Sequence, residues 1–155
     1  MTFRLQDEIK QTKPFPRRSS EASLAIVRTA AVIDHALQDV LRPFDLTPTQ
    51  YNVLRILRGA GEAGLCGREI GERLISQVPD VSRLLDRMDE MGLITRAREE
   101  ADRRHVTARI TVKGQLLVRE VEAPLLKLEK SLFGSVSEAD LIHLIGVLDE
   151  VRNSR

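Results

Sequence analysis

The apolar residues of this 155-residue chain change their spacing near position 105, and this change limits the folds open to the chain. Over most of the sequence they recur every three or four residues, which is the period of an amphipathic α-helix. Over 105–110 they alternate singly with polar residues, which is typical of a strand buried on one face. Residues 93–98 supply a partner strand, and the polar stretch 99–104 between them is typical of a turn. The sequence therefore predicts a mainly α-helical fold with one small antiparallel β-hairpin.

Six helices are predicted around this hairpin. Their approximate ranges are 20–41, 47–59, 67–74, 79–91, 117–132 and 137–151. Pro43 follows the first helix, and Gly92 terminates the fourth. Thr47 and Gln50 have the spacing of a capping pair at the start of the second helix, and Pro124 should bend the fifth. Two short helices followed by a basic hairpin indicate a winged helix-turn-helix.

The sequence indicates a single unit over 20–155, preceded by an irregular arm over 1–19. We expect the winged helix-turn-helix at about 47–112 and dimerisation helices at about 20–42 and 112–153. These terminal helices carry apolar stripes that need a partner surface. The simplest partner is a second copy of the chain, so we expect a homodimer.

The composition argues against several functional classes. The single Cys66 leaves no partner for an internal disulfide, and the three histidines lack the spacing of metal ligands. No nucleophile elbow, P-loop or dinucleotide fingerprint is present, so we expect no enzyme and no bound cofactor or metal. The chain has no apolar run of membrane-spanning length, and its first residues lack a signal-peptide core. We therefore expect a cytoplasmic protein without membrane contact.

Four stretches of the chain together resemble the MarR family of bacterial regulators. They are LTPTQYNVL at 46–54, REIGERL at 68–74, VSRLLDRM with MGLI within 81–94, and DRR with ITVKG within 102–114. The resemblance covers nearly the whole chain from about Ser20 onward. It implies a homodimer that binds a pseudo-palindromic operator in double-stranded DNA, usually as a repressor relieved by a small-molecule effector or by oxidation. The chain departs from the family pattern at Cys66, at Ala101 and at 78–80.

The second helix of a helix-turn-helix enters the major groove with its N-terminal half nearest the bases. In this chain that rule selects Gln77, Asp80, Ser82 and Arg83. Arg83 carries the planar fork that bonds guanine O6 and N7. A bare carboxylate is unfavourable near phosphates, so we expect Asp80 to orient Arg83 or to cap the helix.

Other side chains of the same region suit contacts with the DNA backbone. Ser76 and Arg73 are candidates for phosphate contacts, which position a protein on DNA without reading its sequence. Arg87 has two interpretations that the sequence does not separate. It either contacts DNA or belongs to an ion-paired, solvated face with Asp86 and Glu90.

The predicted wing tip carries a second basic group. Arg103, Arg104 and His105 follow Asp102, whose short carboxylate can shape the turn by bonding backbone two residues on. Arginines in this place suit the narrow, electronegative minor groove of A·T-rich DNA. By resemblance to the family, Arg104 is the favoured groove residue.

Two further sites have competing interpretations. Cys66 lies at a predicted helix N-terminus, which favours a reactive thiolate, but a free cysteine is more often a small buried apolar residue. Redox regulation through Cys66 is therefore an alternative, as is a winged-helix protein-interaction module without DNA binding. The family resemblance also implies an effector pocket between the first, second and fifth helices, where His35, Tyr51 and Arg55 offer polar groups.

Overall fold

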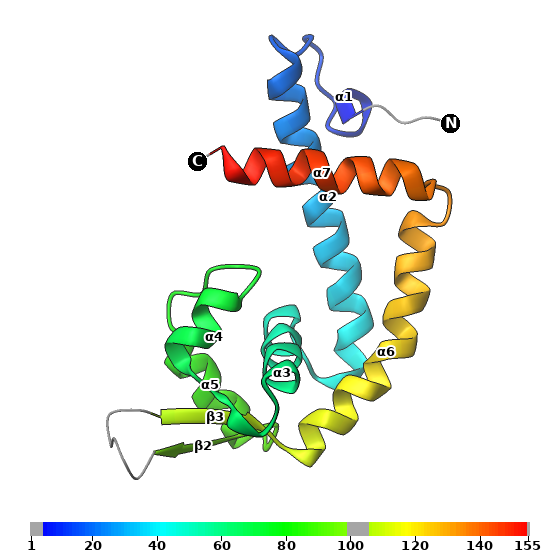
Figure 1. Cartoon of the computed structure of the whole chain (residues 1–155). Coiled ribbons are helices and arrows are strands. Elements are labelled where there is room, and N and C mark those ends of the chain that lie inside the picture. Colours follow the sequence, from blue (N-terminus) through cyan, green and yellow to red (C-terminus); the bar gives the residue numbers. More distant parts are fainter. Residues whose placement is uncertain (1–4, 99–105, 155) are drawn as a thin grey trace. The chain divides into compact units, whose positions relative to one another are not determined.

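The computed structural model describes residues 5–98 and 106–154 of the chain. These residues fall into two compact units, Met1–Pro48 and Thr49–Arg155. The elements of both units are labelled in Figure 1. The mainly helical fold with a small antiparallel sheet agrees with the class expected from the sequence.

The first unit is built on one long helix. Its elements are α1 (Leu5–Glu8), α2 (Arg18–Leu41) and the short 3-10 helix η1 (Arg42–Phe44). α2 ends immediately before η1, which contains Pro43, because proline cannot continue the backbone hydrogen bonds of an α-helix. Within α2 only Leu41 is buried, whereas Leu24, Ile26, Val27 and Val32 are exposed. Most of the apolar stripe predicted for this helix is therefore open to solvent.

The N-terminal arm differs from the sequence expectation. We expected an irregular segment over 1–19, but α1 forms within it and α2 begins at Arg18. Arg28 of α2 pairs with Glu8 of α1 through Nε and Oε2 at 3.5 Å. A four-residue helix carries too little periodicity to be detected from sequence.

The second unit contains nearly all of α3 and every later element. In chain order these are α3 (Pro48–Ala60), η2 (Gly61–Ala63), β1 (Leu65–Cys66), α4 (Gly67–Arg73), α5 (Val81–Glu90), β2 (Ile94–Arg98), β3 (Val106–Ile110), α6 (Val112–Phe133) and α7 (Glu138–Asn153). The predicted helices and both predicted strands are present, with ends that agree to within a few residues. α6 is longer than its apolar repeat, and it continues through Pro124.

The three strands form one antiparallel sheet in the order β1-β3-β2. β2 and β3 make the expected hairpin, with Arg96 opposite Ala108. β1 was missed by the sequence analysis, because two residues cannot display an alternating pattern. Its Leu65 also lies opposite Ala108, on the other edge of β3. Figure 1 shows the hairpin beside α4 and α5.

The apolar core of this unit lies among α3, α4, α5, the sheet and the first half of α6. Its fully buried side chains are Val53, Leu54, Leu57, Ile70, Leu85, Met88, Leu93, Ile94, Val118 and Val121. Aliphatic side chains and one methionine therefore fill it, as the scarcity of aromatic residues requires. The core fixes α5 against the hairpin.

The last helix of the unit, α7, is not part of this core. α7 has no buried residue, although its sequence is rich in leucine, isoleucine and valine. Ser137 caps it, because its hydroxyl accepts the Asp140 backbone N–H at 3.1 Å. Among the described residues no single helix is long and apolar enough to cross a membrane. α6 and α7 pass that test of length and composition only as a pair, bent by 94° at their break.

A prediction concerns the close approach of α6 to the sheet. A Cβ atom on Gly114 would collide with the Leu93 carbonyl oxygen and lie 2.9 Å from Ile110 Cγ1. We expect Gly114→Ala to lower the free energy of unfolding by about 1–3 kcal/mol, because a packed interior resists added volume. Urea denaturation measures this change.

Gly59 supplies the matched control, since it is also a helical glycine and a Cβ there would meet nothing within 4 Å. Gly59→Ala should raise stability by up to about 1 kcal/mol through helix propensity. Equal effects of the two substitutions would contradict the packing described for α6.

Candidate nucleic-acid interface

The N-terminus of α5 is closed by Asp80. The Asp80 carboxylate accepts the backbone N–H of Arg83 at 2.9 Å, which is the bond of a helix N-cap. The capping role expected from the sequence is therefore confirmed. The cap also places a negative charge at the positive end of the helix dipole. It holds the Arg83 backbone at the start of the helix.

The outer face of α5 is open to solvent. Leu85 and Met88 are buried on the inner face, whereas the predicted DNA-contacting residues Ser76, Gln77, Asp80, Ser82, Arg83 and Arg87 are all exposed. Arg87 forms no ion pair with the described part of the chain. Apart from Asp80, which caps the helix, these side chains are open to a partner at the start of α5 and in the loop before it.

The loop before α5 is held on both sides. Asn52 of α3 accepts the Ile75 backbone N–H through Oδ1 at 3.0 Å. The Leu74 N–H closes the end of α4 by bonding the Ile70 and Gly71 carbonyl oxygens. Gly71 keeps the two helices close, because a Cβ there would lie 3.3 Å from Val81 Cγ2. The loop enters α5 from a defined position.

An ion pair joins α5 to the hairpin. Arg96 of β2 donates through Nη1 to Asp86 Oδ1. The Arg96 side chain is only 17% exposed, and its Nε is buried without a hydrogen-bond partner in the described structure. Sequence reasoning placed Asp86 on an ion-paired face with Arg87 and Glu90, and it did not single out Arg96. The pairing instead crosses from the helix to the strand.

The base of the hairpin is fastened to the end of α5. Lys113 Nζ donates to the Met91 carbonyl oxygen at 2.7 Å. The Thr111 hydroxyl donates to the carbonyl oxygens of Gly92 at 2.7 Å and Leu93 at 3.0 Å. Gly92 has a φ of +72°, so it forms the left-handed turn that ends the helix as predicted. These bonds fasten the start of α6 to the turn that follows α5.

The predicted wing-tip residues Asp102, Arg103, Arg104 and His105 lie outside the described residues. The nearest basic side chain that the structure describes is Arg98, which is exposed at the end of β2. Its register partner is Val106 at the start of β3. The four residues fall in sequence between Arg98 and Val106, and their predicted roles, three DNA contacts and one turn-shaping carboxylate, stay predictions.

Cys66 lies between β1 and α4 and is partly buried. The Glu69 carboxylate accepts the Cys66 backbone N–H at 2.8 Å, which is one bond of a capping box at the start of α4. Cys66 thus has a local structural role through its backbone.

The three predicted effector residues belong to both units. Tyr51 and Arg55 lie on α3, whereas His35 lies on α2 within 3.7 Å of Asp39. The Tyr51 side chain is buried, and burial raises the pKa of its hydroxyl above the ordinary value of 10.0, against the opposing charge of Arg55. Tyr51 is therefore a protonated hydrogen-bond donor at neutral pH.

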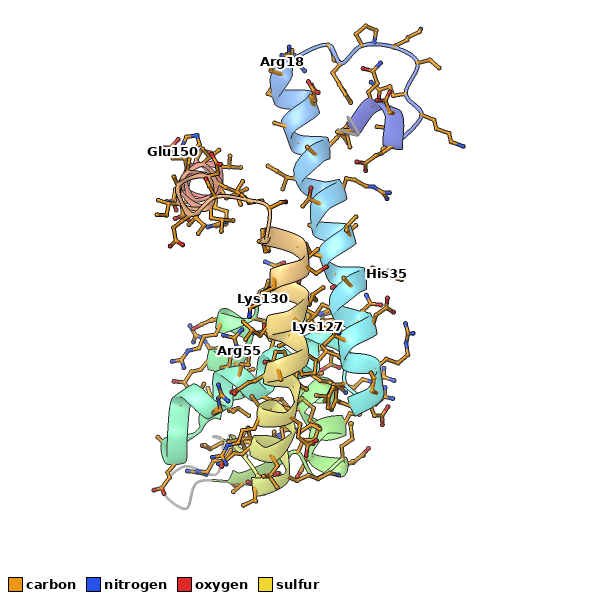
Figure 2. The ribbon with its side chains drawn as sticks, turned by 90° about the vertical axis from the view of Figure 1, so that its right-hand side faces the viewer. Arg18, His35, Arg55, Lys127, Lys130 and Glu150 are labelled. Carbon is orange, nitrogen blue, oxygen red and sulfur yellow. The ribbon has the colours of Figure 1, made fainter. Side chains whose placement is uncertain are left out.

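The second unit adds further charged groups near α3 that the sequence analysis did not select. Arg58 Nη1 pairs with Glu122 Oε1 of α6 at 2.6 Å. Figure 2 labels Arg55 on α3 and Lys127 and Lys130 in the second half of α6. A sequence pattern gives no sign of such pairs, because α3 and α6 are separated by the whole helix-turn-helix and hairpin.

α4, the loop, α5 and the β-hairpin form a winged helix-turn-helix, the architecture of many DNA-binding regulators. A family model described as the MarR family matches residues 44–105. The crystal structure of a MarR transcription factor from Planctomyces limnophilus is 31% identical and matches 88% of this chain and 98% of that one, with a TM-score of 0.69. The chain belongs to the MarR family.

Other relatives agree with this assignment. The HTH-type transcriptional regulator PecS of Dickeya dadantii is 27% identical over 80% of this chain and 75% of its own. The MepR–DNA complex of S. aureus has a TM-score of 0.78 at 23% identity, covering 86% of this chain and 97% of that chain. The protein is a DNA-binding transcription regulator, and its relatives are regulators and not enzymes.

The Asp80 cap yields a prediction. Asp80→Ala should lower the free energy of unfolding by about 0.5–2 kcal/mol, because it leaves the Arg83 N–H without its acceptor. Asp80→Asn should retain most of the stability, since asparagine also caps helices well. Chemical denaturation followed by circular dichroism measures both.

Asp89 provides a comparison near the other end of α5, where an exposed carboxylate makes no cap. Asp89→Ala should leave stability unchanged or slightly raised, because a negative charge is unfavourable at a helix C-terminus. An Asp80→Ala variant as stable as the wild type would refute the capping role.

Proposed function

We propose that the protein binds a pseudo-palindromic operator as a homodimer and represses transcription until a small molecule weakens that binding. The observation that carries the proposal is the exposed outer face of α5, which Asp80 caps and which the Asp86–Arg96 pair joins to the hairpin. A helix and a wing held in one frame can enter adjacent grooves together. The two elements divide the recognition between them.

In this proposal Arg83 reads a guanine edge in the major groove. Its backbone is fixed by Asp80, while its side chain is exposed and has no partner in the described chain. Asp80 acts by holding α5, and its engaged carboxylate contacts no phosphate. Ser76 and Arg73 are exposed at the preceding turn, where they suit contacts with the DNA backbone.

The wing supplies the second contact. Arg104 enters the minor groove, with Arg103 and His105 beside it and Asp102 shaping the turn. β2 and β3 support that turn, and Arg96 ties β2 to α5. A rigid base keeps the distance between α5 and the wing constant, so less conformational entropy is lost when the protein binds DNA.

The exposed apolar face of α7 supports the homodimer. Its exposed large apolar side chains are Ile142, Leu144, Ile145, Val147 and Val151. Figure 2 shows this helix nearly end-on, with side chains projecting around it. An adjoining open cavity of about 590 Å³ is lined by the apolar side chains of Leu126, Phe133, Leu141, Leu144, Ile145 and Leu148. A second copy offers the same surface, as a two-fold interface requires.

A small-molecule effector is supported by the polar groups of α3. The related structures include Bordetella bronchiseptica BpsR, whose DNA binding is regulated by 6-hydroxynicotinic acid, and Rhodococcus jostii CouR bound to p-coumaroyl-CoA. In this chain Tyr51 is a donor and Arg55 an exposed cation, and both suit an acidic ligand. His35, the third residue predicted from the sequence, lies on α2 in the other unit and stays a prediction. Such a ligand acts only by binding the DNA-competent and incompetent dimers unequally.

The proposal is tested by replacing its two arginines. Arg83→Ala should weaken operator binding by roughly five- to hundred-fold and relax the preference for guanine at one position per half-site. Arg104→Ala should reduce the preference for A·T-rich flanks. Fluorescence anisotropy over a series of salt concentrations measures the affinity and the salt slope.

Arg58→Ala is the control, because this exposed arginine lies near the end of α3, outside α5, the wing and the proposed dimer surface. It should leave affinity and salt slope unchanged. Weak binding that is indifferent to DNA sequence, with no effect of Arg83→Ala, would favour the protein-interaction module instead.

A further inference from the structure

The loop between α4 and α5 presents an aliphatic side chain to solvent. Ile75 is 84% exposed, which is the largest exposure among the large apolar side chains of the described residues. Its neighbours Ser76 and Gln77 are exposed and polar. Single exposed apolar residues are common on protein surfaces, so exposure alone does not indicate a binding role for Ile75. Its position in the helix-turn-helix is what supports one.

The position of Ile75 is fixed. Its backbone N–H donates to Asn52 Oδ1 at 3.0 Å, and the preceding Leu74 closes α4 through its own N–H. Isoleucine is branched at Cβ, which restricts its side chain to few rotamers. Ile75 is therefore an apolar group held by a braced backbone in the loop that leads from α4 to the recognition helix α5.

The entrance to the recognition helix is the part nearest the bases in a helix-turn-helix. Arg83, Gln77 and Ser82 offer hydrogen-bonding groups there, but none of them presents an aliphatic surface. The major groove has one apolar feature, the C5-methyl group of thymine, and aliphatic side chains recognise it by contact. Ile75, exposed in the loop before this helix, supplies a matching aliphatic group.

We propose that Ile75 packs against the C5-methyl group of a thymine and so reads one thymine in each half-site of the operator. The inference rests on the proposed DNA-binding function and deepens it. Ile75 determines specificity by excluding water from one methyl group, while Arg83 reads a hydrogen-bonding edge. Ser76 remains free to contact a phosphate beside it.

The test removes that methyl group from the DNA. Each thymine of a selected operator is replaced in turn by deoxyuridine, which lacks only the C5-methyl, and affinity is measured by anisotropy. Deoxyuridine at one position in a half-site should weaken binding of the wild-type protein by about three- to five-fold relative to thymine, as expected for one buried carbon. Replacement in both half-sites should multiply the two losses.

Protein variants complete the double-mutant cycle. Ile75→Ala should weaken binding to the thymine operator by roughly ten- to twenty-fold, because both protomers lose the contact. This variant should be insensitive to deoxyuridine at the same position. Ile75→Val, which keeps the branched carbon, should retain most of the wild-type sensitivity.

Val112→Ala is the matched control. Val112 is a β-branched side chain with 73% exposure at the start of α6, at the opposite end of β3 from the wing tip. This variant should bind both DNAs like the wild type. All variants should keep the wild-type melting temperature, because the altered side chains are exposed.

Two results would overturn the inference while the proposed function stands. The first is that Ile75→Ala binds the operator with undiminished affinity. The second is that each deoxyuridine replacement weakens binding of Ile75→Ala as much as it weakens binding of the wild type. Failure of the wild-type protein to bind any DNA specifically would instead overturn the proposed function, and the thymine contact with it.

Discussion

The Asp86–Arg96 pair links α5 to the wing of the winged unit across the edge of its apolar core. Asp86 lies on α5 and Arg96 on β2, so the bond crosses from the recognition helix to the wing. Burial of Leu85 and Met88 holds α5 on the core. Apolar contacts are non-directional, however, and they do not favour one orientation of the helix as a hydrogen-bonded pair does. The charged pair adds a directional contact, and partial burial of Arg96 makes its loss costly.

Much of this architecture could be predicted from the sequence, because its longer elements carry apolar residues at the period of a helix or of a strand. The alternation over 105–110 identified β3, and Asp80 caps α5 as expected. Other features depend on tertiary contact. β1 is too short to show a period, and Arg96 looks like any exposed arginine in a strand until its partner in α5 is known.

The two ends of the chain present a separate physical problem. α7 buries no side chain within the described chain, yet an isolated helix of this length is marginally stable in water. Exposed isoleucine, leucine and valine on α2 and α7 make association the simplest source of the missing burial. In the proposed dimer, the surface that stabilises the terminal helices also places two recognition helices on one DNA. Stability and symmetric recognition then have a common origin.

Selection of bound sequences from a random pool of double-stranded DNA, with the full-length protein, tests this link most directly. We expect an enriched inverted repeat whose half-sites are centred about one helical turn apart, roughly 10 base pairs, because each protomer presents one α5. Enrichment of a single half-site without symmetry, or of no sequence at all, would contradict recognition of an operator by a symmetric dimer.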